Sequence, residues 1–421
     1  MEDRILNSYN LALKKYKEYN VDVEEVLETL SEVPISIHCW QGDDVGGFEK
    51  PGAQISGGGI QATGNYPGKA QNIKELRQDF EKVISLVPGN HRIALHASYG
   101  DFGGKFVDRN EITPEHFQSW IDWAKKVNIK LDFNCTLFSH PKADAGFTLS
   151  SKSKEIREFW IEHVKRCREI SAEIGKQFRD PCIHNIWIPD GMKDIPVDRA
   201  GHRLILKDSL DEILRKKIPE SQMLDSLEGK LFGIGSESYV VGSHEFYLSY
   251  AITNNTLLTI DSGHYHPTES VGDKISAIIP FIKGLLLHVS RGVRWDSDHV
   301  VILNDDLIQL AEEIVRSHAM EKIKIALDFF DASINRIGAY VIGIRATQKA
   351  LLYALLQPLD LLQDYEESGQ YFQRLAFLEE LKTLPYGAIW NYFCLKNEVP
   401  MGKNWIKDIE IYEKEVLVNR I

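Results

Sequence analysis

Short apolar runs with strand character alternate with helical segments along most of the chain, and this alternation restricts the fold more than any other feature of the sequence. The runs lie at residues 35–40, 92–97, 129–134, 185–190, 223–228, 284–289 and 323–328, and one more begins at residue 257. Helical periodicity fills the intervals between them, as at residues 72–86 and 153–178. Strands that alternate with helices in this way pair in parallel. The sequence therefore predicts an α/β fold, a (β/α)8 TIM barrel.

Further helical segments flank the predicted barrel. Residues 3–32 show helical periodicity in two parts, and the chain after residue 356 is mostly helical and contains aromatic residues. A chain of 421 residues is long enough for a barrel with such additions. We expect a barrel with an N-terminal helical arm over residues 1–356 and a C-terminal helical extension over residues 357–421. An extension of this kind commonly packs against a neighbouring barrel or subunit.

The composition argues against several classes of protein. Hydrophobic residues make up 43% of the chain, but no apolar run approaches the ~20 residues of a membrane-spanning helix. The net charge of −12 argues against broad binding to nucleic-acid backbones, which requires clustered basic surface. The five cysteines are scattered, which indicates free thiols in a reducing compartment. Because the first residues do not resemble a secretion signal, we expect a cytoplasmic protein that binds neither membranes nor nucleic acid.

Residues 257–268 show how one of the predicted strands ends. The apolar run Leu-Leu-Thr-Ile is followed at once by Asp261, and His264 and His266 come shortly after it. Gly263 permits a bend that turns Asp261 and His264 towards a common point. Carboxylate and imidazole ligands together suit manganese, magnesium, cobalt or zinc better than copper. A strand end with an ordinary polar turn explains the same residues, and this stretch alone favours neither interpretation.

Nearly all the predicted strands end in side chains that bind metals or sugar hydroxyls, and the active site of a barrel lies at this end. These side chains are His38, Trp40, His96, Asn134, Trp187, Asp190, Glu228, Lys230, Asp261, His264, His288 and Asp328. The loop after residue 289 adds Asp296 and Asp298, whose spacing allows both to bind one ion on a loop. A solvated acidic turn is the alternative for this loop, and the ligands beside it favour a metal site.

The candidate ligands are too many for a single ion that keeps a position open for substrate. They are Glu228, Asp261, His264, His288, Asp296, Asp298 and Asp328. Two divalent ions are the simplest explanation for a set of this size. A pair of ions can polarise a carbonyl group and lower the pKa of a bound water molecule.

Six long segments carry a likeness to a known family. They are residues 38–44, 58–69, 185–193, 261–269, 293–300 and 327–336, and the third reads Asn-Ile-Trp-Ile-Pro-Asp-Gly-Met-Lys. Over nearly the whole chain they resemble the bacterial L-rhamnose isomerase family. The resemblance implies a ketol isomerase of rhamnose catabolism that interconverts L-rhamnose and L-rhamnulose by a metal-assisted hydride shift. It also implies a barrel related to that of xylose isomerase and assembly as a homotetramer.

The resemblance assigns the candidate ligands to two ions. Those of a structural ion would be Glu228, Asp261, His288 and Asp328, and those of a catalytic ion would be His264, Asp296 and Asp298. Manganese is the usual activator in this family, with zinc or cobalt as alternatives at one site. Residues 228–230 occupy the place of the Glu-x-Lys motif of xylose-isomerase-like enzymes, although the prolines common in that motif are absent here.

The expected mechanism begins with opening of the sugar ring, in which His96 moves a proton between the ring oxygen and a hydroxyl. Lys230 and the metal then stabilise charge on O1 while a hydride moves from C2 to C1. The expected contacts to the sugar are Trp40, Phe133, Trp187 and Asp190. In the rival enediol mechanism a carboxylate such as Asp328 or Asp296 removes the C2 proton directly. We favour the hydride shift because both carboxylates are expected to bind metal, and we count Asp328 among the catalytic residues.

Two functions of other classes stay open. A metal-dependent hydrolase or endonuclease uses similar ligands, although the acidic charge weighs against a nuclease. A sugar-binding module with structural metals is the non-catalytic alternative. The resemblance also leaves the breadth of aldose substrates open, because the far end of the sugar is contacted by loops, and residues 100–105 depart from the family pattern.

Overall fold

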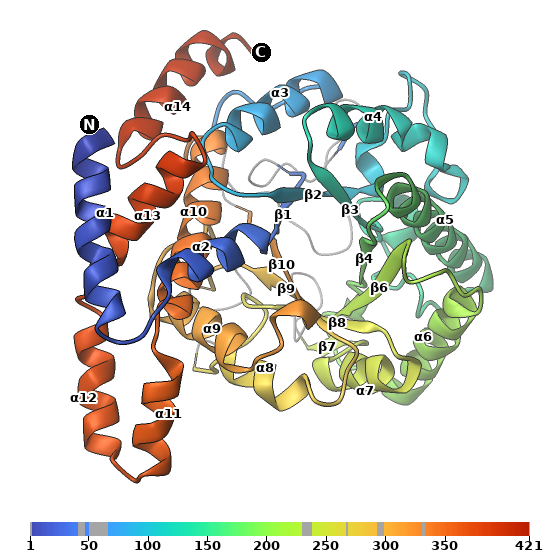
Figure 1. Cartoon of the computed structure of the whole chain (residues 1–421). Helices are drawn as coiled ribbons and strands as arrows, with labels where there is room; N and C mark the ends of the chain where they lie inside the picture. The colour runs from blue at the N-terminus through green and yellow to red at the C-terminus, as the bar shows by residue number, and fades with distance from the viewer. Residues whose placement is uncertain are drawn as a thin grey trace.

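A closed barrel of eight parallel strands forms the centre of the molecule (Figure 1). The computed structural model describes residues 2–40, 47–49, 66–229, 238–266, 268–292, 299–330 and 333–420. The barrel strands are β1 (Ile35–His38), β2 (His91–His96), β3 (Lys130–Asn134), β4 (Cys182–Trp187), β6 (Met223–Glu228), β8 (Leu257–Asp261), β9 (Leu285–Val289) and β10 (Ile323–Leu327). Their order around the barrel is β1-β10-β9-β8-β6-β4-β3-β2, and β1 closes the ring by pairing with both β2 and β10. The predicted (β/α)8 fold is confirmed.

Helices surround the strands (Figure 1). They are α3 (Ile73–Ile84), α4 (Gln118–Lys126), α5 (Lys154–Phe178), α6 (Arg199–Leu214), α7 (His244–Asn254), α8 (Gly272–Ile278), α9 (Asp305–Arg316) and α10 (Arg336–Leu355). Side-chain caps fix some of their starts, since Asn72 accepts a hydrogen bond from the backbone N–H of Glu75 at 3.1 Å. The short strands β5 (Gly191–Met192) and β7 (Tyr239–Val240) pair with each other outside the barrel. Among the helices of the described residues, none has the length and apolar character needed to cross a bilayer.

On the side of the barrel formed by β4, β6, β8, β9 and β10, the lumen changes from apolar to charged along the strands. A small buried apolar cluster consists of Ile183, Leu257, Leu286 and Ala326. Strand β6 shows the change most clearly, because side chains two residues apart face the same side. Leu224 packs on the apolar cluster, the hydroxyl of Ser226 lies 2.6 Å from that of Thr259, and Glu228 ends the strand. Along β6 the polar groups therefore lie towards the carboxyl end of the barrel.

Strand β4 lies three residues earlier than the sequence pattern indicated. It spans Cys182–Trp187, whereas the apolar pattern predicted residues 185–190. The sequence pattern missed the start of β4 because His184 is polar and interrupts the apolar run. This side chain is fully buried and its Nδ1 lies 3.0 Å from Oδ1 of Asp225, which also pairs with Arg168 of α5 at 3.0 Å. Asp190 consequently lies beyond the end of the strand.

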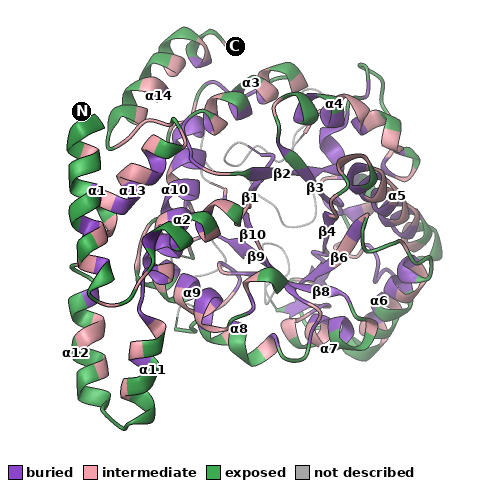
Figure 2. Cartoon of the chain, in the orientation of Figure 1, coloured by how far each residue is buried: buried purple, intermediate pink, exposed green. Residues whose placement is uncertain are grey.

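The N-terminal arm and the C-terminal extension lie together on one flank of the barrel (Figure 1). Their helices are α1 (Glu2–Lys17), α2 (Val23–Glu32), α11 (Leu359–Glu367), α12 (Tyr371–Leu381), α13 (Tyr386–Lys396) and α14 (Asn404–Glu415). The ring of Tyr9 in α1 stacks on that of Tyr392 in α13, with centroids 3.6 Å apart. Figure 2 shows that α12 is largely exposed, and Phe372 on this helix exposes 79% of its surface. The arm thus packs directly on the extension.

Arg420, which follows α14, is tied to α3 through Asp79. The Asp79 side chain is fully buried and accepts hydrogen bonds from Arg420 Nη1 at 2.6 Å, Arg420 Nη2 at 2.8 Å and the Tyr412 hydroxyl at 2.6 Å. We expect Arg420→Ala to lower the free energy of unfolding by about 3 kcal/mol, because it leaves a buried carboxylate without its charge partner. Urea denaturation measures this loss. As a control, Arg374→Ala breaks the more exposed pair with Glu366 and should cost less than about 1 kcal/mol; equal losses would contradict the argument.

Candidate active site

Four of the candidate ligands meet at the carboxyl end of the barrel. They are Glu228, Asp261, His288 and Asp328, which we call the acidic cluster. They come from β6, β8, β9 and the residue that follows β10, and these strands are neighbours in the barrel (Figure 1). One ligand atom from each residue lies within 4.8 Å of those of the other three. Glu228 and Asp261 are only 2% and 1% exposed, so their charges are shielded from water.

A chain of hydrogen bonds orients Glu228. The Asn185 side-chain amide donates to Glu228 Oε2 at 2.6 Å. The oxygen of the same amide accepts a hydrogen bond from the Thr259 hydroxyl at 2.7 Å, so the amide nitrogen must face Glu228. Asn185 of β4 thereby orients the carboxylate, and Thr259 of β8 orients Asn185. Oε1 of Glu228 is the oxygen that remains for a ligand.

Asp261 is held in a similar way by backbone and hydroxyl donors. The backbone N–H of Gly263 and the hydroxyl of Ser290 both donate to Asp261 Oδ1, each at 2.7 Å. Both bonds fall on the same oxygen, and Oδ2 points towards the cluster. It lies 4.0 Å from Nδ1 of His288 and 3.7 Å from Nε2 of His264. The bend at Gly263 therefore brings Asp261 and His264 together.

The electrostatics of the acidic cluster show a shortage of positive charge. Burial and the neighbouring carboxylates of Glu228 and Asp328 raise the pKa of Asp261 well above its ordinary value. Burial opposes protonation of His288, but the carboxylates of Glu228 and Asp328 outweigh it and raise the pKa of His288 well above its ordinary value. Burial also disfavours the charged form of Glu228, yet the positive charge of His288 lowers the pKa of Glu228 to about 2. Without a metal, Asp261 and His288 thus tend to hold protons, and these protons supply the positive charge that a bound cation would supply.

The donor atoms of the acidic cluster fit a divalent metal. Oδ1 of Asp328 is buried and makes no hydrogen bond, and Nδ1 of His288 is buried with carboxylates as its neighbours. Nδ1 of His288 also lies 3.1 Å from Oδ2 of Asp328. Buried polar atoms without partners are costly, and a bound cation satisfies them. Three carboxylates and one imidazole suit a hard or borderline divalent ion.

His264 lies at the edge of the acidic cluster. Its Nδ1 is 3.6 Å from Oε1 of Glu228, and its side chain is almost completely buried. Its expected partners in a second metal site, Asp296 and Asp298, lie outside the described residues, as does Lys230. His266, from the same stretch, is instead exposed, and its Nδ1 lies 2.7 Å from the Thr268 hydroxyl.

Aromatic rings line the lumen next to the acidic cluster. Trp40 stacks on Phe330 with centroids 4.9 Å apart, and its centroid lies 4.3 Å from that of His96. Phe138 is edge-on to Trp187 at 5.8 Å. Trp40, His96 and Trp187 were expected at this end of the barrel. Phe138 and Phe330 were not, because they lie in loops where no strand pattern places them; their aromatic character next to strand ends was the only available signal.

Two expected sugar contacts do not lie at the site. Phe133 is fully buried and packs edge-on against Phe117 with centroids 4.8 Å apart, towards the helices around the barrel. Its neighbour Asp132 faces the lumen instead, since it accepts a hydrogen bond from Ser36 of β1 at 2.7 Å. The expectation failed because adjacent residues of a strand point to opposite faces.

Asp190 is also unsuited to contact the sugar. Its carboxylate is fully buried and receives four hydrogen bonds, from the backbone N–H and the hydroxyl of Thr148 and of Ser150, at 2.5–2.8 Å. Both oxygens are therefore occupied by the preceding loop. The shift of β4 explains the wrong expectation, because Asp190 lies past the strand end. Its position indicates a structural role.

Comparison with known proteins gives full-length matches. The chain matches the family model described as L-rhamnose isomerase (RhaA) over residues 3–420. The L-rhamnose isomerase of Bacteroides thetaiotaomicron is 55% identical over 419 residues, which cover 100% of this chain and 99% of that protein. The L-rhamnose isomerase of Enterobacter sp. is 54% identical, with 100% of both chains covered. That of Rhodopirellula baltica is 52% identical, with 99% of this chain and 97% of that protein covered.

Proposed function

The chain belongs to the L-rhamnose isomerase family, and we propose that it interconverts L-rhamnose and L-rhamnulose at the acidic cluster. The observation that carries this proposal is the buried meeting of three carboxylates and one imidazole at the carboxyl end of a barrel that matches the family over its full length. The reaction opens the sugar ring and then moves hydrogen between C1, C2 and their oxygens.

His96 is the residue that we assign to ring opening. Its side chain is buried against Trp40, and burial lowers its pKa well below the ordinary value, so the imidazole is neutral at physiological pH. A neutral imidazole accepts the proton of the O1 hydroxyl and returns it to the ring oxygen. The bond between C1 and the ring oxygen breaks, and C1 becomes an aldehyde.

A hydride then moves within the open chain. A divalent cation held by the acidic cluster supplies positive charge that stabilises negative charge on the sugar oxygens. The C2–H bond breaks with both electrons and the new C1–H bond forms. The proton lost from the C2 hydroxyl ends on O1, so that C2 becomes a ketone and C1 a primary alcohol. The indole rings of Trp40 and Trp187 exclude water from this transfer. Lys230 is proposed to stabilise charge on O1.

The proposed metal is manganese. Its ligands in the acidic cluster are hard oxygens and one imidazole, which suit this ion. A second divalent ion is proposed on His264, Asp296 and Asp298, with zinc or cobalt as alternatives at one site. The short distance of 3.6 Å between His264 and Glu228 supports a site beside the first.

Deuterium labelling tests the proposal. L-Rhamnose carrying deuterium at C2 should give ketose with the label retained at C1, and only when the metal-stripped protein is supplied with manganese. NMR follows the label. Loss of label to solvent would indicate the enediol path with a carboxylate base such as Asp328. Rhamnose binding without ketose would favour a sugar-binding protein.

The proposal extends to assembly and location. We propose a cytoplasmic homotetramer in which residues 357–421 act as a helical extension of the barrel unit 1–356. Exposed apolar side chains on α12, such as Phe372 and Leu375, support contacts between subunits, because large exposed apolar surface marks interfaces. Light scattering of the purified protein measures the subunit number.

A further inference from the structure

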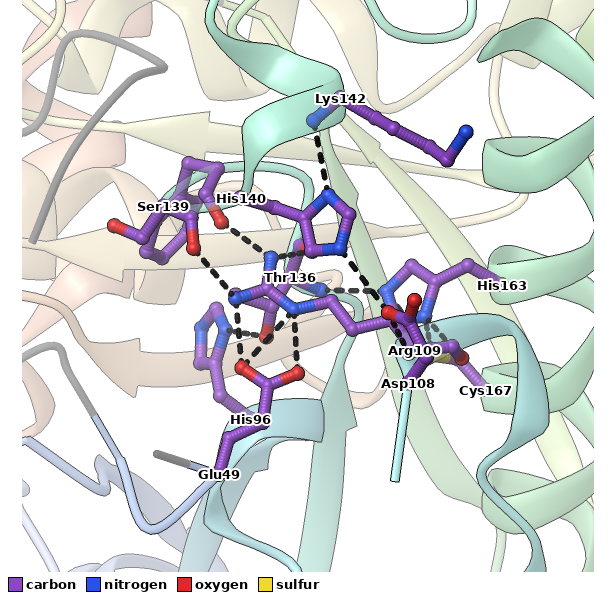
Figure 3. A network of polar contacts seen from close by, with 11 residues as sticks. Glu49, His96, Asp108, Arg109, Thr136, Ser139, His140, Lys142, His163 and Cys167 are labelled. Atoms are coloured by element: carbon purple, nitrogen blue, oxygen red, sulfur yellow. Dashed lines mark hydrogen bonds and ion pairs between the residues drawn. The ribbon is translucent and has the colours of Figure 1, made fainter. Parts of the chain in front are cut away.

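The imidazole of His96 is oriented by one neighbouring hydroxyl. Its Nδ1 lies 3.2 Å from Oγ1 of Thr136, which follows β3 and is fully buried (Figure 3). Rings pack on the rest of His96, with Trp40 at 4.3 Å and Phe138 at 6.0 Å between centroids. The contact to Thr136 therefore determines which nitrogen is available to a sugar, and that nitrogen is Nε2.

A closed ring of three hydrogen bonds fixes Thr136 itself (Figure 3). Its backbone N–H donates to Nε2 of His163 at 3.0 Å, and its carbonyl accepts from Nη1 of Arg109 at 2.7 Å. Nδ1 of His163 lies 3.0 Å from the carbonyl of Arg109 and completes the ring. Because Nε2 of His163 accepts a hydrogen bond from the Thr136 backbone N–H, its Nδ1 must carry the hydrogen that it donates to the Arg109 carbonyl. Both peptide groups of Thr136 are thus held.

Buried charge pairing keeps Arg109 in this position. Its Nε donates to Oε1 of Glu49 at 3.0 Å and its Nη2 to Oε2 at 2.9 Å, a two-pronged geometry that fixes the guanidinium plane. Arg109 also donates to the carbonyls of Phe138 and Ser139. The guanidinium therefore holds the whole segment 136–139, which carries both the hydroxyl and the ring that contact His96.

We propose that Thr136 is a positioning residue for ring opening, which sets the imidazole of His96 so that an unprotonated Nε2 meets the sugar. Nδ1 carries the hydrogen and donates it to Thr136 Oγ1, and Nε2 can then accept the proton of O1 and pass it to the ring oxygen. This inference rests on the proposed function. Beyond the role of His96, it identifies the Thr136 hydroxyl as the group that leaves Nε2 of His96 free to act as the base.

The pair Thr136→Val and Thr136→Ser tests the proposal. Valine has the shape of threonine without the hydroxyl, whereas serine keeps the hydroxyl. Ring opening can be measured alone, as the enzyme-catalysed interconversion of the α and β forms of L-rhamnose by NMR. We expect Thr136→Val to slow this exchange and to lower kcat/KM about 10- to 100-fold, and Thr136→Ser to stay within about 3-fold of the unaltered protein. Equal losses in both variants, or none in Thr136→Val, would overturn the proposal.

A second readout is independent of turnover. Solid-state NMR of protein labelled with 15N-histidine and loaded with diamagnetic Mg²⁺ reports which nitrogen of each imidazole is protonated, and His96→Gln identifies the His96 signals. The expected result is hydrogen on Nδ1 in the unaltered protein and loss of this single form in Thr136→Val. Hydrogen on Nε2, or the same form in both proteins, would overturn the inference. If the unaltered protein makes no ketose, the proposed function fails, whereas this comparison still tests the contact.

Discussion

Asparagine in place of Asp261 should lower kcat about 10³-fold and remove the cation from the acidic cluster. The asparagine oxygen can still accept from Gly263 and Ser290, so the side chain stays in place. Its amide nitrogen has no lone pair for a metal, and one negative charge is lost. Loss of a ligand costs about 4 kcal/mol of the stabilisation that the metal gives to the transition state, which corresponds to this factor. Steady-state kinetics and metal analysis of the purified variant measure both effects.

The same substitution at Asp190 is the matched control. Asp190 is another buried carboxylate near a strand end, but its four hydrogen bonds come from the loop that contains Thr148 and Ser150. Asp190→Asn turns an amide N–H₂ towards these donors and should lower the free energy of unfolding by about 2 kcal/mol. The folded fraction should keep its metal and most of its kcat. An Asp261→Asn protein with full metal content and near-normal kcat would show that the acidic cluster is not the metal site.

Removing the cations with a chelator should abolish activity and leave a protein whose stability falls as pH rises. In the metal-free fold the pKa of His288 lies above its ordinary value of 6.5. Its protonation therefore stabilises the fold fully below pH 6.5, and this stability is lost as pH rises through the raised pKa. Asp261, whose pKa is raised above 3.8, acts in the same direction. The pKa of Glu228 is lowered to about 2, so Glu228 acts in the opposite direction only as pH falls below 4.5.

Thermal unfolding at increasing pH tests this sign, because the stability from protonated Asp261 is lost only above pH 3.8 and that from protonated His288 only above pH 6.5. Manganese at a free concentration of 100 times its Kd should restore activity and add about 2.7 kcal/mol of stability. Its affinity should increase with pH, since the ion displaces protons from Asp261 and His288. The metal-free Asp261→Asn protein should show a weaker fall than the unaltered protein. A metal-free Tm that is constant or rises as pH increases above 6.5 would contradict the argument.

The barrel and the acidic cluster were predictable because both depend on regular features. Strand β6 has the expected bounds, and its alternation places Glu228 on the same face as Ser226. In a closed parallel barrel all carboxyl ends meet, so residues as distant in sequence as 228 and 328 converge without any local signal. The bend at Gly263 was predictable from its lack of a side chain.

Features that depend on side-chain packing were not predictable in this way. Phe133 was expected at the site because it is aromatic and close to a strand end, but the alternation of the strand turns it outwards. His184 is polar and fully buried, and its pairing with Asp225 concealed the start of β4. No pattern in the sequence identified Thr136 as a residue of the site. Its role depends on contacts with Arg109 and His163, which lie 27 residues away on either side.

The division of the barrel wall has an evolutionary consequence. The acidic cluster comes from β6, β8, β9 and the end of β10, whereas Trp40, His96, Thr136 and Trp187 lie on or directly after β1 to β4. Except at Asn185 of β4, which orients Glu228, mutation can therefore alter one half of the wall while the other stays constant. Changes of sugar preference should accumulate in the half built from β1 to β4, and descendants with new substrates should inherit the ligand half unchanged. Libraries for altered specificity are best confined to the first half, with His96, Thr136 and Asn185 left unchanged.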